Sequence, residues 1–182
     1  MATPSTPDEL NTVMSKITSA NQISSPLLRL PAELRNQIYT FVGLSTIIKA
    51  IQPEGSLTCS FQVPEQLKAC KQIRHEATSI VYRSALFDFT QCNTGVWLNG
   101  SCDHSIGEFV TSIKIGGQVA CLVSHYIGKG RSYEGLQFPT KWLPNVQKIY
   151  IKYDACMQQW GFTTGTAMEV LCKKNTMQII FV

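Results

Sequence analysis

The sequence predicts an α+β fold, in which two packed N-terminal helices are followed by a mixed, mainly antiparallel sheet with short helices. Residues 27–43 and 64–84 carry apolar side chains at the 3.6-residue spacing of amphipathic helices. The second half of the chain instead has short apolar runs that alternate with period two, as strands do. Helices that come first and strands that come later are typical of α+β domains.

Length and composition indicate one globular domain. The 182 residues are 44% hydrophobic and 15% charged, which is enough to build a core. A net charge of +4 is too small to predict nucleic acid or anionic lipid as a partner. No apolar run approaches the roughly 20 residues that span a bilayer, so we expect no membrane contact. The first thirty residues lack a basic start followed by an apolar stretch, and the unpaired cysteine pattern favours reduced thiols, so we expect an intracellular location, cytoplasmic or nuclear.

Residues 1–25 are rich in Ser, Thr, Pro and Asn, and they predict a flexible N-terminal arm. Thinly spaced apolar residues within it indicate a short amphipathic helical turn at about residues 7–18. Residues 26–182 then form the single domain.

The cysteines and the reactive side chains near them indicate no enzyme. Seven cysteines without a C-x-x-C pair fit neither a complete disulfide framework nor a zinc site, so we expect reduced thiols. Cys102, Asp103, His104 and Glu108 lie close together, but adjacency in sequence supplies neither an oriented base nor an oxyanion donor. A turn before a helix start explains them better, and we expect no catalysis, cofactor or metal.

The first predicted helix lies within residues 27–43, begins at Pro31 and has the clearest helix signals in the chain. Pro31 suits a first helical position, Glu33 suits the positive first turn, and Gly43 suits the C-terminal end. The apolar stripe that should pack against the rest of the domain comprises Leu30, Leu34, Ile38, Phe41 and Val42. A short β-branched strand is predicted next, at residues 45–51.

The second predicted helix covers residues 64–84. Its apolar face comprises Val63, Leu67, Cys70, Ile73, Ala77, Ile80 and Val81, and Arg74 falls inside this stripe. A buried guanidinium needs partners, so we expect Arg74 to bind Glu33 of the first helix or, alternatively, carbonyls of an incoming loop. The alternation in residues 86–89 predicts a strand that contains Phe87 and Phe89.

The remaining residues predict more strands with helical turns between them. Gly116-Gly117 between two alternating runs indicates a hairpin, and residues 106–110 indicate a helical turn before it. Residues 146–153 and 177–182 predict strands, residues 128–135 a loop and residues 165–174 a short helix. Ile113, Ile149 and Ile179 each follow a helix or turn at spacings of 36 and 30 residues, which indicates a degenerate leucine-rich-like layout.

Two sequence blocks resemble the F-box-like domains that are abundant in filamentous fungi. The first is LLRLPAELRNQIYTFV at residues 27–42, and the second is LKACKQIRHEATSIVYRSALFDF at residues 67–89. Together they cover about 40 residues in the family's order. The positions that match the second block are Cys70, Lys71, Gln72, Ile73, Arg74, Glu76, Ala77, Tyr82, Phe87 and Phe89.

The resemblance implies a fold in which helices from the two blocks pack together, with Glu33, Cys70, Ile73, Arg74, Tyr82, Phe87 and Phe89 in structural roles. It also implies non-catalytic protein recognition, as a substrate-recognition subunit of a cullin-RING ubiquitin ligase that binds a Skp-type adaptor. Residues 43–63 depart from the family pattern, because a strand-like segment replaces the short middle helix. The residues expected to bind the partner are Leu27, Leu28, Leu30, Pro31, Leu34 and Ile38.

Position on the stripe divides these partner-binding residues into two groups. Leu34 and Ile38, with Phe41, lie near its centre and are expected in the core, whereas Leu27, Leu28 and Pro31 lie at its start and are better docking candidates. The alternative function is a nucleic-acid-binding or scaffolding module with a basic surface. Its candidate residues on the second helix are Lys68, Lys71 and His75, although a solvated helix face explains them more simply.

Overall fold

The structure is a computed structural model that describes residues 7–56, 58–93, 101–102, 104–128, 143–153, 155 and 177–182. Its helices are α1 (Pro7–Ser24), α2 (Ala32–Leu44), the short 3-10 helix η1 (Glu65–Lys68), α3 (Lys71–Ser84), α5 (His104–Gly107) and α6 (Gly117–Gly128). Its strands are β1 (Ile47–Ile51), β2 (Thr58–Phe61), β3 (Leu86–Asp88), β4 (Ser101–Cys102), β5 (Ser112–Ile115), β6 (Lys148–Ile151) and β7 (Gln178–Phe181).

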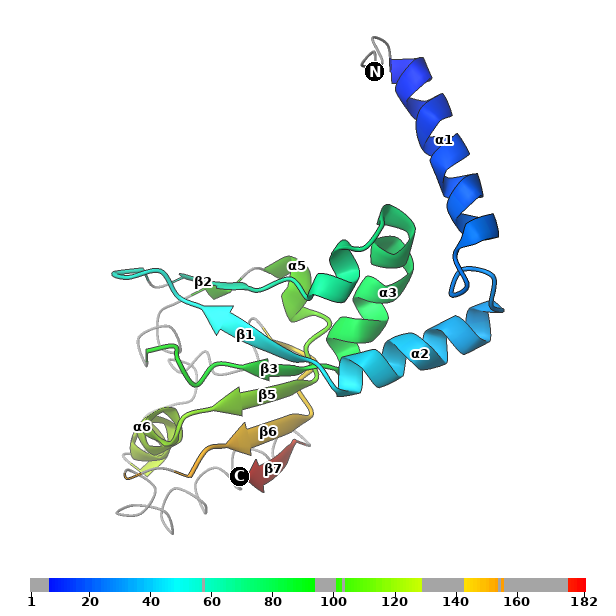
Figure 1. Ribbon diagram of the computed structural model, residues 1–182. Coiled ribbons are helices and arrows are strands. Elements are labelled where there is room, and N and C mark those ends of the chain that lie inside the picture. Colours follow the sequence, from blue (N-terminus) through cyan, green and yellow to red (C-terminus); the bar gives the residue numbers. More distant parts are fainter. Residues whose placement is uncertain are drawn as a thin grey trace.

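The strands form one mixed sheet in the order β4-β2-β1-β3-β5-β6-β7, which agrees with the predicted α+β class (Figure 1). The prediction that this sheet is mainly antiparallel is wrong. Only the β1–β2 pair is antiparallel among the described strands, and the other five pairs are parallel. Parallel neighbours need long crossover connections, and the strands from β3 onward are separated by enough chain to supply them.

One apolar row runs across the parallel part of the sheet. Ile113, Ile149 and Ile179 are Cα partners on β5, β6 and β7, and Phe87 and Ile48 continue the row onto β3 and β1. These strands therefore lie side by side in chain order. The three isoleucines occupy equivalent register positions, as expected, although their spacings of 36 and 30 residues are too unequal for a true solenoid repeat.

The hairpin predicted at Gly116-Gly117 is wrong. Gly117 instead begins helix α6, so the alternating Val119, Cys121 and Val123 are helical residues. Val119 and Ala120 are buried, and their N–H groups both donate to the carbonyl of Gly116. A short apolar run is compatible with the two-residue period of a strand and with the 3.6-residue period of a helix. In this chain the run forms a helix, whose Val119 and Ala120 pack into the core.

The second predicted helix is divided into η1 and α3. Cys70 between them is extended, with φ of −157° and ψ of 164°, and its Sγ accepts a hydrogen bond from the N–H of Ile73 at 3.4 Å. Because Cys70 caps α3, the continuous helix expected over residues 64–84 is corrected to a 3-10 turn followed by a helix that begins at Lys71.

Several other predicted elements lie where the sequence placed them. The first predicted helix is α2, residues 45–51 hold β1, residues 86–89 hold β3, and the strands at residues 146–153 and 177–182 are β6 and β7. The helical turn at residues 106–110 corresponds to α5. The loop at residues 128–135, apart from Gly128, and the helix at residues 165–174 lie outside the described residues.

Residues 7–24, within the predicted arm, form the long helix α1, so the amphipathic turn expected at residues 7–18 is part of a longer helix. Figure 1 shows α1 projecting away from the sheet and from the other helices. Its Val13, Ile17 and Ile23 side chains are exposed. No helix in the described part of the chain is long and apolar enough to cross a membrane.

An aromatic cluster joins the helical part to the sheet. The ring of Phe61 on β2 meets those of Phe87 and Phe89 edge to face at centroid distances of 5.1 and 5.7 Å, and Tyr82 of α3 packs on Phe87 at 6.0 Å. All four side chains are buried. Edge-to-face contacts of this kind stabilise a core by about 0.5–1.5 kcal/mol beyond the burial of their area.

Candidate protein-docking surface

Helix α2 presents an apolar face to solvent. The exposed fractions are 45% for Leu34, 39% for Ile38, 75% for Phe41 and 70% for Leu44. These four residues, which we call the α2 stripe, recur every three or four positions and so lie on one side of the helix. The prediction that Leu34, Ile38 and Phe41 belong to the core is therefore wrong.

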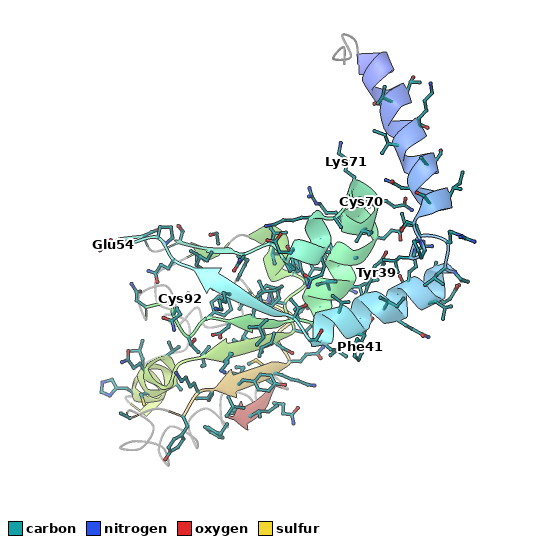
Figure 2. The ribbon with its side chains drawn as sticks, in the orientation of Figure 1. Tyr39, Phe41, Glu54, Cys70, Lys71 and Cys92 are labelled. Carbon is teal, nitrogen blue, oxygen red and sulfur yellow. The ribbon has the colours of Figure 1, made fainter. Side chains whose placement is uncertain are left out.

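The opposite side of α2 is the one that packs. Tyr39 and Gly43 are buried, and Arg35 and Val42 are partly buried. Figure 2 shows Tyr39 on the side of α2 toward α3 and Phe41 on the other side. The buried positions also recur every three or four residues, so periodicity alone does not distinguish the two faces.

A close approach at Gly43 determines which face is inside. A Cβ atom at Gly43 would lie 2.7 Å from Cβ of Ser84 and 3.0 Å from the carbonyl oxygen of Val81, both in α3. Real Cβ atoms do not come so close, so only glycine allows the two backbones this separation. The packing turns Phe41 and Leu44, on either side of Gly43 in the chain, toward solvent.

An ion pair links α2 to α3. Nε of Arg35 donates to Oε2 of Glu76 at 2.9 Å, and Nη1 of Arg35 donates to the carbonyl of Leu30 at 2.7 Å. Gln72 donates its amide N–H to the other oxygen of Glu76 at 2.9 Å. Both charged side chains are mostly shielded from water, which strengthens the pair relative to one at the surface.

The electrostatics of this cluster follow from these contacts. Burial acts to raise the pKa of Glu76, but the hydrogen bonds from Gln72 and Arg35 outweigh it and leave the pKa below its ordinary value. Burial, and then the charge of Glu76, raise the pKa of the Tyr39 hydroxyl. The Tyr39 hydroxyl oxygen is buried without a hydrogen bond of good geometry to any described residue.

The expected pairing of Glu33 with Arg74 is wrong. Arg74 is exposed, outside the buried stripe, and its Nε donates to the carbonyl of Leu67 in η1 at 3.0 Å. Leu67 lies within the range predicted as the second helix, so this contact is not with an incoming loop either. Glu33 is exposed on the first turn of α2.

The segment before α2 is anchored to the domain. Leu28 is buried at 7% exposure, Leu27 packs against the core, and Leu30 is partly buried, whereas Pro31 is exposed. Leu28 is thus inaccessible as a docking residue. Of the six residues expected to bind a partner, Pro31, Leu34 and Ile38 are the exposed ones, and Phe41 and Leu44 extend their surface.

A hollow adjoins the C-terminal end of the α2 stripe. Its cavity volume is about 290 Å³, and its lining residues include Ile47 and Val63, which are exposed. Residues 45–47 lead from α2 into β1 and residues 62–66 follow β2, so the ends of the β1–β2 hairpin border this hollow, and its lining includes the polar residues Ser45, Thr46, Gln62, Glu65 and Gln66. An apolar stripe that ends at a hollow suits the docking of another protein.

A second hollow lies on α3 and is lined by Lys71, Arg74, His75 and Thr78. It contains two of the three residues of the predicted basic helix face. The third, Lys68, is paired with Glu65, with 2.6 Å between Nζ and Oε1.

Cys92 is a buried thiol, whereas Cys59 is part of a disulfide bond. Burial, and then the nearby Asp88 carboxylate, raise the pKa of the Cys92 thiol to about 11. Cys70, Cys92 and Cys121 are not disulfide-bonded. Cys59 is disulfide-bonded, so the prediction of seven reduced thiols is wrong for this residue; its Cα partner in the β2–β4 register is Cys102.

The reactive residues named from the sequence surround the start of α5 in the chain. Cys102 lies in β4 and α5 begins at His104, while Asp103 lies outside the described part of the chain. No group of three or more potential metal ligands occurs within the described ranges.

Comparisons of the chain with family models, with curated proteins and with solved structures found no match.

Proposed function

We propose that this chain is a non-catalytic protein-interaction protein that binds a Skp-type adaptor through the α2 stripe. The observation that carries the proposal is the exposure of Leu34, Ile38, Phe41 and Leu44 together on one side of one helix. Three of these four residues lie within the block that resembles the first helix of fungal F-box-like domains. Within that resemblance, the chain serves as a substrate-recognition subunit of a cullin-RING ubiquitin ligase.

The physical chemistry supports docking at this stripe. Burying a fully exposed large apolar side chain gains about 1.5–3 kcal/mol, and each residue of the stripe gains the share that corresponds to its exposed fraction when a partner covers it. An aromatic residue near the centre of such a surface is a typical hot spot, and Phe41 occupies that position. The close contact at Gly43 fixes the position of α2 against α3, so little conformational entropy is lost on binding.

The test is a titration of the full chain with a purified fungal Skp-type adaptor. We expect binding at micromolar concentration or tighter, and Phe41→Ser should weaken it about 10- to 100-fold. Ile23→Ser is the matched control, because Ile23 on α1 is 76% exposed and Phe41 is 75% exposed. Both variants should keep the wild-type unfolding midpoint, because neither side chain is in the core.

Two outcomes count against the proposal. If the wild-type chain ignores the adaptor at micromolar concentration, Skp-type binding is rejected. If the adaptor binds but Phe41→Ser binds equally well, the adaptor uses another surface.

The alternative is nucleic-acid binding at the α3 hollow, which Lys71, Arg74 and His75 favour. It requires salt-sensitive retention of the chain on heparin or RNA that is lost in Arg74→Glu. Elution of the wild-type chain from both matrices at low ionic strength would exclude it.

A further inference from the structure

The parallel sheet has one face in the core and one face turned away from it. In β1, β5 and β6 the buried residues alternate with exposed or half-exposed ones. The register aligns the second set into rows, of which one is Lys49, Asp88, Lys114, Tyr150 and Ile180. We call this side of the sheet the open face.

Three lysines surround Tyr150 on the open face. Lys114 is its register partner on β5, Lys148 lies two residues before it in β6, and Lys152 lies two residues after it, just past the end of β6. Neighbouring strands are about 4.8 Å apart and two residues of strand span about 7 Å, so the Cα atoms of the three lysines lie within about 7 Å of the Cα atom of Tyr150. Lys49 adds a fourth cation at the β1 end of the same row.

These cations have no partners among the residues that the structure describes. Lys49, Lys114, Lys148 and Lys152 make neither an ion pair nor a side-chain hydrogen bond with any residue in the described ranges. The acidic residue in the row, Asp88, accepts hydrogen bonds from both the N–H and the hydroxyl of Thr90. The open face therefore carries an excess of unneutralised positive charge around a half-exposed tyrosine.

We infer that the open face binds an acidic, extended segment of a partner protein, with carboxylates against Lys114, Lys148 and Lys152 and with Tyr150 beneath the segment. Charge complementarity determines the sign of the partner. Alternate side chains of an extended peptide point the same way about 7 Å apart, so every second one of them repeats at the roughly 13 Å that separate Lys148 from Lys152. The inference concerns a different surface from the α2 stripe and does not depend on adaptor binding.

The composition of the open face favours a polypeptide over a nucleic acid. Asp88 lies between Lys49 and Lys114, and a polyphosphate backbone would meet this carboxylate. Ile47 and Leu86 are register partners on the same face, and they offer apolar contacts to side chains but nothing to phosphates. A peptide can present acidic residues at β5 and β6 and apolar residues at β3 and β1.

The probe is a fluorescein-labelled dodecapeptide with glutamate at alternate positions, followed through fluorescence anisotropy at low ionic strength. The same peptide with glutamine at those positions is the ligand control, and a 12-nucleotide single-stranded RNA is the competing probe. Lys148→Glu/Lys152→Glu changes two exposed residues of the face. Lys16→Glu/Arg29→Glu changes the net charge equally at exposed positions elsewhere.

We expect the glutamate peptide to bind more tightly than the glutamine peptide and than the RNA, and to release as salt shortens the screening length. Lys148→Glu/Lys152→Glu should weaken binding about tenfold or more, while Lys16→Glu/Arg29→Glu leaves it within about twofold. Lys114→Gln repeats the test with a milder change, and equal unfolding midpoints show that each variant is folded.

Three results would overturn the inference. The first is absence of glutamate-peptide binding by the folded wild-type chain at low ionic strength. The second is an equal loss in the two double variants, which would show attraction to net charge alone. The third is tighter binding of the RNA through Lys148 and Lys152, which would assign the open face to nucleic acid.

Discussion

Replacement of Gly43 tests the contact that orients the whole of α2. In Gly43→Ala, the new Cβ would lie 2.7 Å from Cβ of Ser84 and 3.0 Å from the carbonyl oxygen of Val81. The second contact is with backbone, so the helices must separate rather than a side chain turn aside. Overpacking of this kind costs about 1–3 kcal/mol, and the better helix propensity of alanine returns up to about 1 kcal/mol.

The net expectation for Gly43→Ala is a loss of about 1–2 kcal/mol in the free energy of unfolding. For a chain of this length, each kcal/mol corresponds to a fall of about 2–4 °C in Tm. Urea unfolding and thermal melts followed by circular dichroism measure both quantities. Because the strain is local, Ser84→Gly in the same chain should recover part of the loss.

Gly116→Ala is the matched control for this change. A Cβ at Gly116 would meet only the carbonyl oxygen of Thr90, at 3.9 Å, an ordinary van der Waals distance. That variant should be as stable as the wild type or about 0.4–1 kcal/mol more stable. If Gly43→Ala is as stable as the wild type, α2 and α3 do not approach as closely as the structure has them. The explanation given for the exposure of the α2 stripe would then be wrong.

Three further predictions concern the dependence of stability on acidic pH, the contribution of buried Leu28 before α2, and the reactivity of the buried Cys92 thiol. Because the pKa of Glu76 is lowered in the folded chain, its stabilising contribution is complete above its unfolded value near 4.5 and is lost as pH falls through the folded value. Glu76→Gln should therefore lower the free energy of unfolding by about 1–3 kcal/mol at pH 7, as urea unfolding measures. On acidification the variant should lose less of this free energy than the wild type does. Parallel dependence of the unfolding free energy on pH in the two proteins would contradict this. Leu28→Ala should cost about 2–4 kcal/mol, whereas deletion of residues 1–24 should change the unfolding free energy by less than about 1 kcal/mol; a deletion as costly as the substitution would mean that α1 packs on the domain. The Cys92 thiol, with its pKa at about 11, should react with iodoacetamide at pH 8 about a hundredfold more slowly in the folded chain than in urea. Peptide mass spectrometry measures both alkylation rates. Equal rates in the folded and the unfolded chain would show that the Cys92 thiol is exposed to water.

Local signals predicted the elements of the fold better than their arrangement. The proline before α2, the glycine near its end and the β-branched runs of β1, β6 and β7 indicated those elements correctly. The parallel direction of the strands was missed, although Ile113, Ile149 and Ile179 were recognised as equivalent. Their spacings of about 30 residues exceed the length of a hairpin and fit a crossover, which is the signal that could have predicted a parallel sheet.

The α2 stripe shows why the candidate site was only partly predictable. The helix has two sets of residues with helical period, one purely apolar with Leu34, Ile38 and Phe41, and one mixed with Arg35, Tyr39 and Gly43. Hydrophobicity alone assigns the first set to the core. The structure buries the second set because a glycine allows close approach and because Arg35 has partners for its charge. An apolar face left in water is what a docking surface requires, so the failed core prediction and the proposed function have one physical origin.

The rotation of α2 about its axis also determines which charged residues link α2 to α3. The two sequence blocks offer acid and base in both directions, Glu33 with Arg74 and Arg35 with Glu76. Side chains two positions apart on a helix are about 200° apart around its axis, so a helix that buries Arg35 must expose Glu33. Once Gly43 sets the rotation of α2 against α3, Arg35 faces Glu76 at 2.9 Å and the other pairing is geometrically excluded. If the rotation is set by packing at Gly43 rather than by the ion pair, Glu76→Gln should weaken the domain without weakening adaptor binding to the α2 stripe, whereas Gly43→Ala should weaken both.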